Sequence, residues 1–175
     1  MKRLLLIALA LALAACNLPR QVRPTPSAAA SSSPAPCAFV EDRQPLPDLS
    51  ARFLAGLKSA GLPVETARAE AYGESCVTAD GSSAHFTASE TDFYVTLQVG
   101  AIDDEALLGK LLEELLAVVE KMPADQLGPN PGYVGVTFKA GDQVQNLWFT
   151  RTQASTLQSQ GIRGADLYRA LNTRP

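Results

Sequence analysis

The fold is decided by one stretch of the chain, residues 92–122, which reads DFYVTLQVGAIDDEALLGKLLEELLAVVEKM. In its first eight residues, Phe93, Val95, Leu97 and Val99 alternate with polar or amphipathic residues. Such alternation is typical of a β-strand that buries one face. We therefore predict that residues 85–99 are extended, with the apolar side chains turned toward a core.

The second part of this stretch predicts a helix over residues 103–122. Asp103, Asp104 and Glu105 open it, and acidic side chains suit the positive end of a helix dipole. Leucines and valines then recur at helical spacing and form a broad apolar stripe, and Pro123 stops the helix. A strand followed by a long amphipathic helix predicts a helix layer packed on a sheet.

The same patterns predict further elements on both sides. A helix is expected over residues 48–60 and a strand over residues 68–77, with Asp80-Gly81 as a hairpin turn. A second hairpin is expected from residues 133–139 and 144–151, and a short amphipathic helix over residues 164–171. The predicted order is α-ββ-α-ββ-α. We expect an α+β domain, an antiparallel sheet of four to five strands with two main helices on one face.

The chain begins with MKRLLLIALALALAAC, residues 1–16. Lys2 and Arg3 form a positive start, and the apolar run after them is too short to cross a bilayer core, which takes about 20 helical residues. This pattern is typical of a secretory signal peptide, here residues 1–15.

The end of that leader, LAAC at residues 13–16, resembles the lipobox of bacterial lipoproteins. The resemblance implies that the leader is removed and that Cys16 becomes the first residue. Cys16 then carries a diacylglyceryl group and further acylation, with fatty acids such as palmitate. The expected location is extracytoplasmic, anchored by lipid to a bacterial membrane, either the cell membrane or an outer membrane. The alternatives are an ordinary secreted protein and an uncleaved anchor.

Residues 16–36 contain five prolines and runs of Ala and Ser. This composition predicts a disordered tether after the lipidated cysteine. Residues 37–175 then form a single domain of common size. Cys37 and Cys76 remain as an even pair in an oxidising compartment, so we expect a disulfide between them.

The sequence offers little catalytic chemistry. It has one histidine, His85, no serine in a GxSxG motif, no phosphate-binding loop and no metal-binding pair of histidines. We predict no cofactor, no metal site and no catalytic residue. The net charge of −3 and the lack of a basic cluster argue against nucleic acid as a partner. The carboxylates Glu90 and Asp92 leave open an alternative, an envelope enzyme or enzyme inhibitor.

One candidate binding surface emerges from the strand alternation. Tyr94, Tyr133 and Trp148 would lie on the sheet face opposite the helices, around Gly135. Aromatic side chains with polar tips are enriched at interfaces; alternatively, the C-terminal helix or the N-terminus covers this face. The sequence therefore predicts a non-enzymatic binding or accessory module of the cell envelope, tethered through Cys16, with an unknown protein or small-molecule ligand. A structural subunit of an envelope complex is a further alternative.

Overall fold

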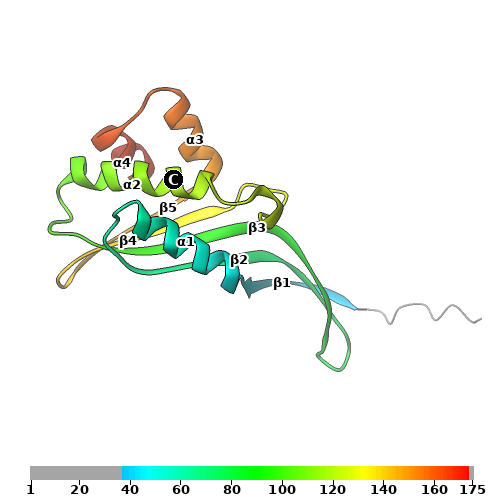
Figure 1. Cartoon of the computed structure of the whole chain (residues 1–175). Helices are drawn as coiled ribbons and strands as arrows, with labels where there is room; N and C mark the ends of the chain where they lie inside the picture. The colour runs from blue at the N-terminus through cyan, green and yellow to red at the C-terminus, as the bar shows by residue number, and fades with distance from the viewer. Residues whose placement is uncertain (1–36, 174–175) are drawn as a thin grey trace, which may run out of the picture. The chain divides into compact units, whose positions relative to one another are not determined.

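The computed structural model describes residues 37–173 (Figure 1). The predicted signal peptide, lipidated Cys16 and tether lie outside the described residues. The elements are β1 (Ala38–Pro45), α1 (Pro47–Ser59), β2 (Val64–Val77), β3 (Ser83–Gln98), α2 (Glu105–Glu120), the 3-10 helix η1 (Ala124–Gln126), β4 (Tyr133–Ala140), β5 (Gln143–Thr150), α3 (Arg151–Ser159) and α4 (Gly164–Asn172).

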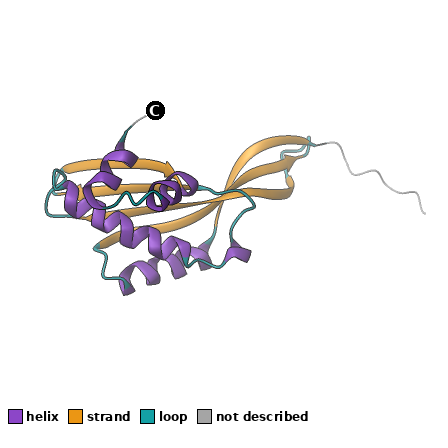
Figure 2. Ribbon diagram, turned by 90° about the horizontal axis from the view of Figure 1, so that it is seen from above, coloured by secondary structure: helices purple, strands orange, loops and turns teal. Residues whose placement is uncertain are grey.

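The domain is α+β, as predicted, with the helices on one face of a five-stranded sheet (Figures 1 and 2). The strands lie in the order β1-β2-β3-β4-β5. The prediction of an antiparallel sheet was wrong at one pairing, because β3 and β4 run parallel. Helix α2 connects these two strands and carries the chain back across the sheet, and such a crossover is what a parallel pair requires.

The predicted element order was also incomplete. Strand β1 precedes α1 and pairs with β2 along its whole length, although its sequence AFVEDRQP holds three charged residues and a proline. Helix α3 follows β5 directly and buries only Ala154, so it has no apolar stripe to find in the sequence. Its start is set by Thr150, whose hydroxyl accepts a hydrogen bond from the Gln153 N–H at 3.0 Å.

The core lies between the sheet and the helices. Phe93, Val95 and Leu97 of β3 are buried, which confirms the predicted alternation. The ring of Phe53 on α1 meets Phe93 edge to face with centroids 4.9 Å apart, a geometry that aromatic pairs favour. The other fully buried large side chains include Leu57, Leu97, Leu108, Leu112, Leu115, Phe138, Phe149 and Leu167.

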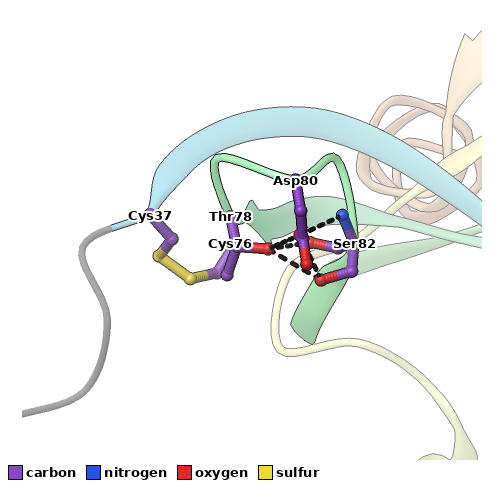
Figure 3. Close-up of a disulfide and its surroundings, with 5 residues drawn as sticks. All are labelled: Cys37, Cys76, Thr78, Asp80 and Ser82. Carbon is purple, nitrogen blue, oxygen red and sulfur yellow. Dashed lines mark hydrogen bonds between the residues drawn. A yellow bond between two sulfur atoms is a disulfide. The ribbon is translucent and has the colours of Figure 1, made fainter.

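Strands β1, β2 and β3 continue together toward Cys37, and there the predicted disulfide joins Cys37 to Cys76 with their Cα atoms 5.4 Å apart (Figure 3). The loop between β2 and β3 is closed by Asp80, which accepts hydrogen bonds from the Thr78 hydroxyl and from the Ser82 N–H (Figure 3). These bonds, the one from Thr78 first, lower the pKa of Asp80 to about 2. Gly81 has a φ of 82°, which confirms the predicted turn at Asp80-Gly81.

Helices α2 and α4 approach each other closely at Gly109. A Cβ atom at this position would lie 1.9 Å from the carbonyl oxygen of Gly164. The carboxylate of Glu113, one turn further along α2, accepts a hydrogen bond from the N–H of Gly164 at 2.6 Å. The lack of a side chain at Gly109 therefore allows α4 to dock against α2.

We expect Gly109→Ala to lower the free energy of unfolding by about 1–3 kcal/mol, the usual effect of overpacking a core. Alanine alone would stabilise an open helix position by about 1 kcal/mol, but here the clash is with backbone, which cannot move aside. The matched control is Gly100→Ala, where a Cβ meets nothing within 4 Å. Urea denaturation of the three chains measures the difference, and equal effects of the two substitutions would contradict the close α2–α4 contact.

Candidate functional site

The sheet face opposite the helices is open among the described residues, and no helix lies on that side in Figure 1. The expectation that α4 covers it is wrong, because Leu167, Tyr168 and Leu171 are buried in the core on the helix side. The described N-terminal residues, from Cys37 onward, do not cover it either, since β1 joins the sheet as an edge strand beside β2. All α-helices of residues 37–173 contribute to the core on one side of the sheet, so the side chains of the second face point toward solvent.

Trp148 is the most prominent side chain of this face and is 50% exposed. Its indole lies 5.5 Å from the ring of Tyr133, nearly parallel, and 5.3 Å from the ring of Tyr94. The structure thus brings together the three aromatic residues predicted from the sequence. We call Tyr94, Tyr133 and Trp148 the aromatic cluster.

Gly135 makes room for the aromatic cluster. It lies on β4 and pairs with Tyr94 of β3 on one side and with Trp148 of β5 on the other. A Cβ atom at Gly135 would lie 2.5 Å and 2.8 Å from two atoms of the six-membered indole ring. The indole therefore rests on the bare backbone of Gly135, and a shallow groove of about 310 Å³ runs beside it, bordered by Arg68, Thr137 and Asn146.

Two arginines surround the aromatic cluster. The guanidinium of Arg68 lies 4.1 Å from the ring centroid of Tyr94, and that of Arg43 lies 4.8 Å from the ring centroid of Tyr72. Cations over aromatic rings at such distances are attracted to the ring face. Sequence reasoning missed Arg43 because β1 was not recognised. Arg68 is the first residue of the predicted strand 68–77. Its spacing of four residues from Tyr72 places both side chains on the same face of that strand, and this spacing was a usable signal.

Asp92 lies beneath this face and is completely buried. One of its oxygens accepts a hydrogen bond from the Tyr133 N–H at 2.8 Å. The other accepts from Arg43 at 2.6 Å and from the Tyr94 hydroxyl at 3.3 Å. Both oxygens are therefore occupied, and the carboxylate holds three strands together. Its hydrogen bond raises the pKa of Arg43, while burial, followed by the charge of Asp92, raises the pKa of Tyr94 to about 12.

Glu90, the second carboxylate considered for catalysis, lines a separate open hollow of about 730 Å³ together with Glu41, Arg43, Tyr72 and Tyr133. Burial and the neighbouring charge of Asp92 raise the pKa of Glu90. The structure places Glu90 and Asp92 on the same strand, but Asp92 is enclosed while Glu90 faces the hollow. The two do not form a pair of free carboxylates around a substrate.

The remaining candidates take structural positions. His85 is exposed and meets the ring of Phe39 edge-on at 6.1 Å. Asp104 caps α2, accepting a hydrogen bond from the Leu107 N–H at 3.0 Å. Within residues 37–173, no group of three or more potential ligands is arranged to hold a metal ion. Cys16 lies outside the described residues.

Gly128 and Gly132 flank the segment that leads into β4. The N–H of Gly128 donates to the Thr91 hydroxyl at 2.9 Å. A Cβ at Gly132 would lie 2.0 Å from the Thr91 carbonyl oxygen. This segment therefore packs directly against β3 and positions Tyr133 in the aromatic cluster.

Comparison of the chain with models of protein families, with curated proteins and with solved structures returned no match. Among the helices of the described part of the chain, none has the length and apolar character to cross a membrane.

The exposure of Trp148, which is the single tryptophan of the chain, can be measured directly. We expect a red-shifted emission maximum and ready quenching by acrylamide, because half of the indole surface meets solvent. The same chain unfolded in urea provides the fully accessible reference. A blue-shifted and protected emission from the native chain would contradict an open sheet face.

Proposed function

We propose that this chain is a membrane-tethered extracytoplasmic lipoprotein whose folded domain is a non-enzymatic binding or accessory module of the cell envelope. The proposed location rests on the lipobox-like sequence LAAC and on the signal-peptide pattern before it. The proline- and serine-rich composition of residues 16–36 supports a spacer between the lipid and the domain. In this proposal the lipid on Cys16 anchors the chain to the membrane, and the folded domain binds a ligand.

The half-exposed Trp148, resting on Gly135 with Tyr94 and Tyr133 beside it, carries the binding part of the proposal. Tryptophan, tyrosine and arginine dominate the binding energy of protein interfaces. Here they are held in place before any ligand arrives, because Tyr94 and Tyr133 are both bonded to the buried Asp92. A rigid surface loses little entropy on binding, which favours affinity.

The second candidate is an envelope enzyme or enzyme inhibitor acting through Glu90. One observation favours it, the raised pKa of Glu90 beside an open hollow. A general acid or base would need a partner group, however, and the neighbouring Asp92 is already occupied by Arg43, Tyr94 and Tyr133. We therefore prefer the binding module.

The lipid anchor predicts that cells expressing the chain incorporate a tagged fatty acid into it. Cys16→Ser removes the acceptor thiol, so the label should be lost completely. The control is a chain with both Cys37→Ser and Cys76→Ser, which should keep the label because those thiols belong to the disulfide. Equal labelling of Cys16→Ser and the unchanged chain would exclude lipidation at Cys16.

The binding face predicts that the chain beginning at residue 17, without any lipid, co-sediments with cell envelopes prepared from the source cells. The double substitution Tyr133→Ala and Trp148→Ala should reduce the bound fraction at least tenfold. Truncation of such anchor residues typically costs about 2 kcal/mol or more of binding free energy for each residue. Phe39→Ala is the matched control, because Phe39 is also an exposed aromatic residue, 62%, and lies on β1 outside the aromatic cluster. Equal losses for both chains would refute a specific role of this face.

A further inference from the structure

The two edges of the sheet differ in how they are protected. Strand β1 carries Glu41, Asp42 and Arg43 and ends at Pro45. Charges and prolines on an edge strand discourage pairing with another chain. Strand β5, which reads QVQNLWFT, has neither a charge nor a proline, and its register with β4 is unbroken. The β1 edge is therefore protected against pairing with another chain, whereas the β5 edge is able to pair.

The register of β5 determines which of its backbone groups face outward. Beyond the strand, the N–H of Arg151 donates to the carbonyl of Gly132 at 3.0 Å, so the odd-numbered residues exchange hydrogen bonds with β4. The N–H and C=O groups of Val144, Asn146 and Trp148 must then point away from the sheet. Among residues 37–173 no backbone bond from a loop or helix end reaches them. The Asn146 carbonyl receives only a long contact, 3.5 Å, from the Gln145 side chain.

A groove of about 800 Å³ runs along this edge. Five consecutive residues of β5, from Asn146 to Thr150, line it. Side chains alternate between the two faces of a strand, so a hollow that touches five in a row must follow the strand edge. Leu171, Asn172 and Thr173 at the end of α4 form its other wall. The space beside β5 is thus open to an extended segment.

The side chains of β5 are self-complementary. Val144 is 51% exposed and Trp148 is 50% exposed, two of the five exposed large apolar side chains among the described residues. They lie on the same face at equal distances from Asn146. If β5 meets a second β5 in antiparallel sense with Asn146 opposite Asn146, each Trp148 lies opposite a Val144. Aromatic and β-branched side chains form favourable cross-strand pairs, and an uncharged strand meets its copy without repulsion.

We propose that two copies of this chain pair through their β5 edges, antiparallel about a two-fold axis at Asn146. The two five-stranded sheets become one continuous sheet, and the outward N–H and C=O groups of Val144, Asn146 and Trp148 bond to those of the second copy. The two aromatic clusters then lie side by side on one face. The proposal depends on the β5 edge alone and holds whatever the open face binds.

Cross-linking tests this arrangement, because only a residue on the axis meets itself. In a hydrogen-bonded antiparallel pair the Cα atoms are about 5.5 Å apart, inside the range of about 4.4–6.8 Å that a disulfide bridges. In the full chain carrying Cys16→Ser, in mild detergent, Asn146→Cys should give a disulfide-linked dimer on oxidation. Glu41→Cys on the β1 edge is the control and should stay monomeric. Equal or absent cross-linking of the two variants overturns the proposal.

The mass of the protein in the same detergent, measured by light scattering, gives an independent readout. The chain with Cys16→Ser should have the mass of two copies, and Asn146→Lys should weaken dimerisation about tenfold or more, because it places two ammonium groups opposite each other. Thr137→Val removes the hydrogen bond between Thr137 and Asn146 without adding charge, so it should leave the dimer intact. A single-copy mass for the Cys16→Ser chain at its highest soluble concentration overturns the proposal.

Discussion

The buried carboxylate of Asp92 is the constraint on which the arrangement of this domain depends. It has no contact with solvent, and its hydrogen bonds reach Arg43 on β1, Tyr94 on β3 and the first residue of β4, Tyr133. A buried charge is tolerated only when it is paired and hydrogen-bonded. The three partners come from strands that are not all neighbours. The cost of leaving the charge unpaired therefore favours the arrangement that brings these strands together.

The aromatic cluster is a consequence of this constraint. Tyr94 and Tyr133 are held by bonds to Asp92, and Trp148 packs against both of them over the bare backbone of Gly135. Asp92, which could be taken for a catalytic acid, therefore supports the aromatic cluster. The same strand that supplies this support, β3, supplies Phe93, Val95 and Leu97 to the core on its other face.

The helices account for why one sheet face is free. The crossover α2 and the helices α1 and α4 all contribute to a single core on one side. Most of their large apolar side chains are buried there, so no amphipathic element among the described residues is left to cover the other side. Strand β5 lies at the margin of this arrangement, with one backbone edge unpaired and Trp148 on the open face. The open face and the free edge therefore meet at Trp148.

Local patterns were sufficient for much of this fold. The alternation in residues 92–99 and the apolar stripe in residues 103–122 predict β3 and α2, since burial of one face imposes a period of two on a strand and 3.6 on a helix. The cysteine count predicts the disulfide between Cys37 and Cys76. The dipeptide Asp80-Gly81 predicts the turn between β2 and β3. Strand β1 and helix α3 could not be found in this way. Most of β1 is exposed and α3 buries one alanine, so neither carries a hydrophobic period.

The sequence by itself therefore determined the α+β class, the side chains that face the core and the grouping of Tyr94, Tyr133 and Trp148 on one sheet face. Each of these follows from which side chains avoid water. Only the tertiary structure decided the parallel pairing of β3 with β4, the burial of Asp92 beneath Arg43 and the openness of the aromatic face. These depend on the path of the chain through α2 and on where α4 docks against Gly109. Contacts between residues far apart in the chain leave no local period to detect.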